Sequence, residues 1–111
     1  MAWRCSIRGT LFIGTNGGGV QALTPSGDWL DFKDEIGRFD VNPNAMFFDG
    51  NRLFVGTLNR GVFIYDTRKR QWSNFTNGLG SLNVTAIVAD ADHIYFGTFS
   101  GITEVERRLF N

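Results

Sequence analysis

The sequence predicts an all-β protein built from one sheet unit that recurs along the chain. A phrase of three apolar residues closed by Gly-Thr occurs at residues 11–15, 53–57 and 94–98. Its glycines stand at positions 14, 56 and 97, so the unit recurs about every 42 residues, a period typical of repeat architectures. No apolar spacing of the helical kind is sustained along the chain, whereas short β-branched and aromatic runs alternate with Gly, Asn and Asp.

The first unit is expected to hold four strands, at residues 3–7, 11–15, 20–23 and 29–32. Three consecutive glycines at 17–19 predict a loop with positive φ, which glycine adopts without steric cost. The segment from Thr24 to Asp28 has the composition of a turn between the third and fourth strands.

The second and third units repeat this order. A long connection leads to strands expected at residues 45–48, 53–57, 62–65 and 72–75, with a hairpin turn at Asp49-Gly50-Asn51. The third unit is expected to hold strands at 84–89, 94–98 and 102–105, and residues 106–111 provide no clear fourth strand.

Four antiparallel strands in a repeat of this length form the blade of a β-propeller. The chain is therefore predicted to be a single partial β-propeller of about two and two-thirds blades, with blade 1 at about 2–33, blade 2 at about 44–76 and an incomplete blade 3 at about 83–111. The glycine of each phrase predicts close backbone approach or a bulge. Trp29 and Trp72 are expected at matching packing positions between blades.

Composition excludes several classes of partner. Lys plus Arg and Asp plus Glu number 11 each, so no net field attracts nucleic acid or an anionic membrane. Cys5 is the one cysteine, so no intrachain disulfide is expected. No apolar run approaches the roughly 18 residues of a membrane helix. No signal-peptide core follows the first residues, and the compartment is left unknown.

The units resemble the two-component-regulator propeller repeat, whose consensus joins a V-T-A-I strand, an acidic turn, an L-W-I-G-T strand, a G-G-G-L strand and a strand with Trp or Phe. The matching segments are Val84-Thr85-Ala86-Ile87 with Asp90, the three Gly-Thr phrases, and the glycine-led strands that follow them. The resemblance implies a ring-shaped sensory module of bacterial signalling proteins, often extracytoplasmic, in some cases tied to glycan sensing. In two departures from the family, this chain has fewer repeats, and Phe12, Phe54 and Tyr95 replace the usual tryptophan.

A partial ring would expose apolar faces and unpaired strands at both ends. Two interpretations follow. The chain assembles with itself into a closed homo-oligomeric ring, in which one subunit's terminal strand completes another's partial blade; a dimer would supply about six blades and a trimer about eight. Alternatively, the chain is a piece of a longer propeller. We favour assembly, because a monomer with two bare apolar faces is unfavourable in water.

Few residues suggest chemistry beyond folding. Asn16-Gly17-Gly18-Gly19 lacks the Lys-Ser/Thr of a phosphate loop and leads into a strand, so a turn is favoured. Asp90-Ala91-Asp92-His93 has the residue types of a metal site, but a hairpin turn is favoured, because Asp49-Gly50-Asn51-Arg52 occupies the same place one repeat earlier without a set of ligands. Asp34, Glu35 and Asp40 would serve glycoside hydrolysis only if they face one another. Arg68-Lys69-Arg70 is explained by a turn.

A ligand site is expected where loops of successive units converge at one mouth of the ring. The loops after the Gly-Thr phrases contribute Asn16, Asn59, Arg60 and Ser100, and the connections between units contribute Asn42, Asn44, Asn77 and Asn83. Amide and guanidinium groups bind polar ligands such as glycans, but asparagine is also a good turn former, and the turn role is the favoured explanation. No cofactor and no metal are expected.

The favoured function is a non-enzymatic propeller module for binding or scaffolding. The alternative is an enzyme of the same fold, a lyase or hydrolase acting on a polysaccharide or lactone. The single histidine, His93, and the scarcity of carboxylates at repeated loop positions favour the first interpretation.

Overall fold

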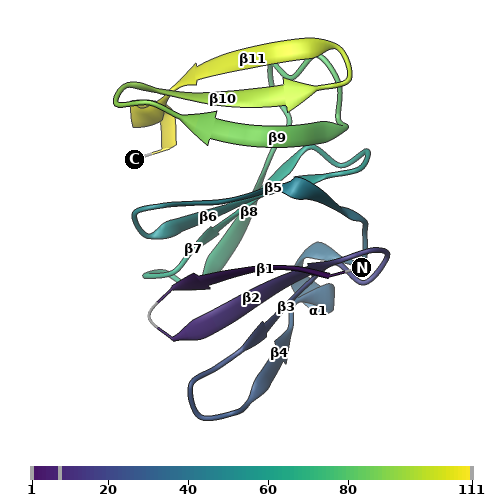
Figure 1. The fold of residues 1–111 in the computed structure, drawn as a ribbon, viewed down its shortest axis with the longest axis vertical. Coiled ribbons are helices and arrows are strands. Elements are labelled where there is room, and N and C mark those ends of the chain that lie inside the picture. The colour runs from purple at the N-terminus through teal and green to yellow at the C-terminus, as the bar shows by residue number, and fades with distance from the viewer. Residues whose placement is uncertain (1, 8, 111) are drawn as a thin grey trace.

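The computed structural model describes residues 2–7, by their backbone alone, and residues 9–110. All eleven expected strands form, and they make three antiparallel sheets (Figure 1). The prediction of an all-β protein is therefore confirmed. Sheet A contains, in spatial order, β1 (Ala2–Ile7), β2 (Thr10–Thr15), β3 (Val20–Leu23) and β4 (Trp29–Asp31).

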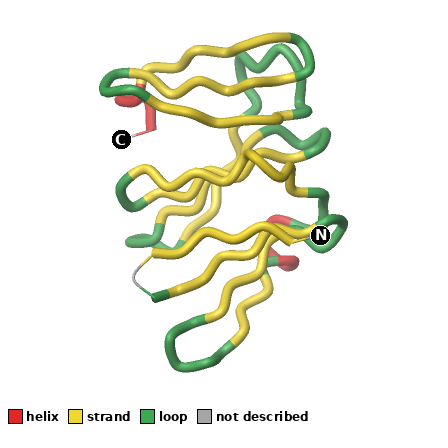
Figure 2. The backbone as a smooth tube through the Cα atoms, viewed as in Figure 1, coloured by secondary structure: helices red, strands yellow, loops and turns green. Residues whose placement is uncertain are grey.

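Sheets B and C repeat this order. Sheet B contains β5 (Val41–Asp49), β6 (Arg52–Thr57), β7 (Val62–Asp66) and β8 (Gln71–Phe75). Sheet C contains β9 (Val84–Ala89), β10 (His93–Thr98) and β11 (Gly101–Glu106). Each strand pairs with the next one along the chain, because the connections within a sheet are tight turns and short loops (Figure 2).

The structure differs from the expected elements in three places. β5 begins at Val41, before the expected start of the second unit at residue 44, and its register shifts between Val41 and Met46. The long connection before it holds one helical turn, α1 (Lys33–Ile36), and the chain ends with a 3-10 helix, η1 (Arg107–Phe110). No helix in the described part of the chain is long and apolar enough to cross a membrane.

Sheet B lies between sheets A and C, and the three are stacked face to face (Figure 1). The first strands approach one another most closely: β5 lies against β1 on one side and against β9 on the other. Sheet B therefore buries both of its faces, which explains why β6 and β7 are apolar at almost every position.

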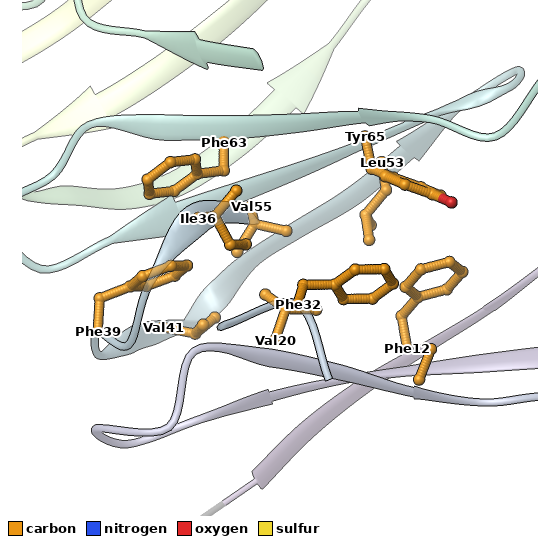
Figure 3. Close-up of a cluster of buried hydrophobic side chains, with 11 residues drawn as sticks. Phe12, Val20, Phe32, Ile36, Phe39, Val41, Leu53, Val55, Phe63 and Tyr65 are labelled. Carbon is orange, nitrogen blue, oxygen red and sulfur yellow. The ribbon is translucent and has the colours of Figure 1, made fainter. Parts of the chain in front are cut away.

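Sheets A and B are joined by a cluster of apolar side chains that point toward one another (Figure 3). The cluster contains Phe12, Val20 and Ala22 of sheet A; Val41, Leu53, Val55, Phe63 and Tyr65 of sheet B; and Phe32, Ile36 and Phe39 from the connection. The connection expected to be a solvated loop thus supplies part of the core. Burying each of these large side chains contributes about 1.5–3 kcal/mol.

Sheets B and C are joined by a second cluster, in which Phe54 and Val62 of sheet B face Ile94 and Phe96 of sheet C. Phe110 of η1 enters this cluster, and its ring lies 5.2 Å from that of Phe54.

Phe110 takes the place that a fourth strand fills in sheet B. Trp72 of β8 packs its ring 5.2 Å from Phe32 between sheets A and B. Phe110 packs 5.3 Å from Phe75, which occupies the same position in sheet B as Phe32 in sheet A. The Arg107 guanidinium bonds the Asp49 carboxylate in sheet B, so an ion pair holds η1 against that sheet.

The glycine of the repeated phrase lies where the next sheet approaches. A Cβ on Gly14 would stand 2.6 Å from Val41 Cγ1 of sheet B. A Cβ on Gly56 would stand 2.5 Å from Ala45 Cβ of its own sheet, and 2.9 Å from Val84 Cγ1 and 3.1 Å from the Val84 carbonyl oxygen of sheet C. A Cβ on Gly97 would meet nothing closer than 3.5 Å. The expected close approach is confirmed for the first two glycines, and the third faces an uncovered side of sheet C.

This difference gives a test of the stacking. We expect Gly56→Ala to destabilise the fold by about 1–3 kcal/mol, because the added methyl group overpacks the junction of sheets B and C, against Ala45 and Val84. Gly97→Ala serves as the matched control and should change the free energy of unfolding by less than about 0.5 kcal/mol. Urea unfolding followed by circular dichroism measures both. Equal losses in the two variants would contradict the stacking order.

Candidate functional site

The three Gly-Thr phrases end in loops that are closed in the same way. The hydroxyls of Thr15, Thr57 and Thr98 donate to the carbonyl oxygens of Gly19, Gly61 and Gly101, at 3.0, 2.8 and 2.9 Å. Threonine satisfies a carbonyl of its own loop and fixes the reversal of the chain. The repeated threonine is therefore structural.

Connections between the sheets run past these loops and bond to them. Gly19 N donates to the Phe39 carbonyl oxygen at 2.9 Å, and Gly61 N donates to the Leu82 carbonyl oxygen at 2.9 Å. The two groups of residues expected to form a ligand site therefore lie at one rim of the stack, next to α1 (Figure 2).

The side chains of that expected site divide into two kinds. Most are exposed to solvent at this rim: Asn16, Asn44, Asn59, Arg60, Asn77 and Ser100. Asn59 has φ of 74°, the left-handed conformation that asparagine tolerates in turns, so its turn role is direct. The structure brings both groups to one rim without showing them converging on a common point.

Asn42 and Asn83 are partly buried. The Asn42 amide donates to the carbonyl oxygens of Thr57, at 3.1 Å, and of Val84. It therefore joins sheet B to the first strand of sheet C. Asn83 Oδ1 is buried and accepts no hydrogen bond within the described part of the chain.

Asn42 and Asn44 form a matched pair for separating folding from binding. We expect Asn42→Ala to lower the free energy of unfolding by about 1–3 kcal/mol, because two carbonyl oxygens lose their donor. Asn44→Ala, two residues away and exposed, should leave it within about 0.5 kcal/mol of wild type. Denaturant unfolding measures both values. An Asn42 variant as stable as the Asn44 variant would remove its bridging role.

The Asp90–His93 turn has the hairpin geometry weighed from the sequence. Asp90 Oδ1 accepts from Asp92 N at 2.9 Å and from His93 N at 2.8 Å, and Asp90 Oδ2 accepts from the Tyr95 hydroxyl at 2.9 Å. His93 Nε2 lies 3.1 Å from Glu104 Oε1. Within residues 2–7 and 9–110, no group of three or more His, Cys, Asp or Glu side chains is placed to hold a metal ion.

These hydrogen bonds predict that the stability of the protein falls at acid pH. The backbone N–H groups of Asp92 and His93 and the Tyr95 hydroxyl hold the pKa of the Asp90 carboxyl below its usual value. Stability from this carboxylate is complete above the unfolded pKa, about 3.9, and is lost as the pH falls through the lower folded pKa. The urea midpoint of Asp90→Asn should therefore fall less than that of wild type between pH 5 and pH 2, both approximate limits.

Asp92→Asn is the control for this measurement, because the neighbouring Asp92 carboxylate is not the acceptor of these bonds. It should keep the acid dependence of wild type. If the urea midpoint of Asp90→Asn fell with pH as steeply as that of wild type, the hydrogen bonds of this turn would not contribute to the pH dependence of stability.

The remaining acidic candidates are Asp34, Glu35 and Asp40, and within the described residues the structure gives them no common partner. Asp34 and Glu35 are exposed in the first turn of α1. Asp40 is partly buried at the β2–β3 loop, and its carbonyl oxygen accepts from Leu58 N at 3.0 Å. Arg68 and Lys69 donate their backbone N–H groups to the Asp66 carboxylate, which confirms the turn expected there.

One cavity was missed by reasoning from the sequence. It lies at the opposite rim, between sheets A and B, and its walls include Phe12, Phe32, Tyr65 and Arg70. The aromatic residues were assigned to the core and Arg70 to a turn. A local signal was Arg70 itself, since its place in a tight hairpin is one where glycine is usual.

No protein-family model matches the sequence, and a comparison with curated proteins finds no match. Among solved structures, the chain is similar to the computationally designed Ika4 protein, with 17% sequence identity and a TM-score of 0.67. It is also similar to the computationally designed Ika8 protein, with 16% identity and a TM-score of 0.67.

The alignments cover 93% of this chain in both cases, but only 63% of Ika4 and 32% of Ika8. The chain therefore spans less than two thirds of either designed protein. At this identity the likeness concerns the fold alone. The resemblance to the two-component-regulator repeat stays a prediction.

Proposed function

We propose that this chain is a non-enzymatic binding and scaffolding module whose sheets are β-propeller blades. Its two end faces are completed by sheets of the same kind, from further copies of the chain or from a longer chain that contains it. The approach of β1, β5 and β9 to one another supports a common axis. A sensory role of the kind implied by the two-component-regulator resemblance is compatible with such a module.

One observation supports the proposal. Residues that are buried between the sheets have counterparts at the same repeat positions on the two end faces, and there the counterparts are exposed. Val20 of sheet A and Val62 of sheet B each follow the glycine that closes the Gly-Thr loop. They are 1% and 0% exposed, against sheets B and C. Ile102 holds the same position in sheet C and is 78% exposed, since no sheet covers that face.

The outer face of sheet A shows the complementary pattern. Trp72 in β8 packs between sheets A and B, where it contacts Tyr65 at 4.9 Å. Trp29 holds the same place in β4, opposite Leu23, and is 60% exposed. Each end thus presents one half of a contact that the chain makes twice inside itself. The outer face of sheet C in one copy is therefore expected to pack against the outer face of sheet A in a second copy.

Polar groups at the rims favour a non-enzymatic module. The Asp66 and Asp90 carboxylates cap turns, and Asn42 joins two sheets. The side chains best placed for chemistry are therefore engaged in holding the fold. Turnover of a polysaccharide or lactone by the purified chain would contradict this part of the proposal.

A mixing experiment tests completion by a second copy. We expect light scattering at micromolar concentration to give a mass above that of the monomer. Ile102→Glu blocks the outer face of sheet C and Trp29→Glu blocks that of sheet A, so each variant alone should be monomeric. Equal mixing should restore a dimer, because one intact face of each kind remains.

Leu109→Glu is the control, since this exposed residue of η1 lies outside both outer faces. It should keep the wild-type mass. If Trp29→Glu alone remained dimeric, two like faces would be meeting and the head-to-tail arrangement would be wrong. A monomeric wild type would exclude self-assembly and leave completion by a longer chain.

A further inference from the structure

A cavity of about 450 Å³ opens between sheets A and B at the rim away from the Gly-Thr loops. Four chain segments form it: the start of β2, the end of β3, β4 with the residue after it, and the β7–β8 hairpin. It lies inside one chain, so it is independent of how the end faces are completed. Its size is that of a site for a small molecule.

The floor of the cavity is aromatic. The Phe12 ring lies 5.6 Å from the Tyr65 ring, and the Phe32 ring lies 5.4 Å from it. All three side chains are almost completely buried, so their orientation is fixed by packing. Figure 3 shows the three rings at one end of the cluster, with the Tyr65 hydroxyl pointing away from the buried side chains. This floor favours a flat apolar group.

The walls of the cavity are formed by one apolar side chain and by threonine hydroxyl groups. Leu30 of β4 is 42% exposed and lines the cavity, although β4 otherwise carries a solvent-facing aspartate and tryptophan. Thr10 and Thr67 line the remaining sides. Burial raises the pKa of the Tyr65 hydroxyl, so this group is a neutral hydrogen-bond donor at pH 7.

Arg70 supplies the charge at the rim. Of the charges that act on Tyr65, the largest effect is that of Arg70, ahead of the carboxylates of Glu35 and Asp66. The Asp66 carboxylate accepts from Arg68 N and Lys69 N and lies 4.0 Å from Arg52, so it is already engaged. Arg70 is the one charged side chain among the described residues that line the cavity.

The backbone of Arg70 is in a conformation that disfavours a side chain. Its φ is 53°, and its N–H donates to the Asp66 carbonyl oxygen at 2.8 Å. In the β3–β4 hairpin the positive-φ residue is Gly27, the usual choice. An arginine at such a position costs stability, and strain of this kind concentrates at functional sites.

The corresponding space between sheets B and C lacks these features. It is smaller, about 280 Å³, and Phe110 lies in it. Its walls carry Arg52 and Asp66 where the first cavity has Thr10 and Thr24, and Lys69 lies in the same lining. The Asp66 carboxylate therefore lines this space and would repel an anion. The larger cavity, with no carboxylate among the described residues that line it, is particular to the junction of sheets A and B.

We propose that this cavity binds a small carboxylate with a flat apolar body, the body lying on Phe12, Phe32 and Tyr65 and the carboxylate facing the Arg70 guanidinium and the Tyr65 hydroxyl. Arginine and a phenol donate to a carboxylate with favourable geometry, and the aromatic floor excludes water beneath it. The chain then carries a ligand site in addition to its scaffolding faces.

Benzoate is a suitable probe, with acetate and benzyl alcohol as its two halves. Titrations followed by ¹⁵N–¹H NMR should show saturable benzoate shifts at the amides of the cavity. Acetate lacks the ring and benzyl alcohol lacks the charge, so each should bind about tenfold or more weakly. Arg70→Gly should lower benzoate affinity by about 10- to 100-fold, because it removes a charge-assisted hydrogen bond.

Two features of these variants keep the test decisive. Glycine suits φ of 53°, so Arg70→Gly should be folded and at least as stable as wild type, and it should still bind benzyl alcohol. Lys69→Ala removes the same charge from the same hairpin without altering the cavity wall, and it should keep benzoate affinity within about twofold of wild type.

The proposal would be overturned by any of three results: no benzoate shifts at the cavity, equal affinity for benzoate and acetate, or equal losses in Arg70→Gly and Lys69→Ala. The last would mean general attraction to the basic hairpin. None of these measurements depends on the mass of the assembly, so the scaffolding proposal stands or falls separately.

Discussion

Close stacking of two-sided apolar sheets is the constraint on which the rest of this structure depends. Stacked sheets lie about 10 Å apart, so facing strands must interdigitate their side chains. Gly14 and Gly56 are the points where sheet-to-sheet approach leaves no room for a Cβ. The same constraint explains why β6 and β7 of the central sheet are buried at almost every position, whereas β11 of sheet C is exposed at alternate positions.

The stacking also accounts for how the ends of the strands are built. Because successive sheets meet at the Gly-Thr rim, the loops there are fixed by a threonine hydroxyl on one side and by the next connection on the other. One polar side chain at that rim, Asn42, holds two sheets together, whereas most of the others are exposed to solvent. At the opposite rim a cavity lies between sheets A and B beside Tyr65.

Sheet C shows how the chain manages a missing strand. η1 turns back over the B–C junction, where Phe110 joins the aromatic cluster and Arg107 pairs with Asp49. The interior of that junction is thereby closed within one chain. The outer face of sheet C has no such closure, and it mixes the apolar Ile102 with the charged Glu104. A second copy bound there, as we propose, would combine hydrophobic contact with a polar margin.

The strands and the turns between them were determined by the sequence alone, because alternation and turn residues act over a few neighbouring positions. The repeated phrase indicated close approach at all three of its glycines, and only Gly14 and Gly56 have another sheet that near. Tertiary structure alone decided that Trp72 is packed while Trp29 is exposed, and that Phe110 replaces a strand. It also decided that Asn42 donates hydrogen bonds to two sheets and that Arg70 lines a cavity. Each of these outcomes depends on what lies across from a residue, and the opposing group comes from a distant part of the chain.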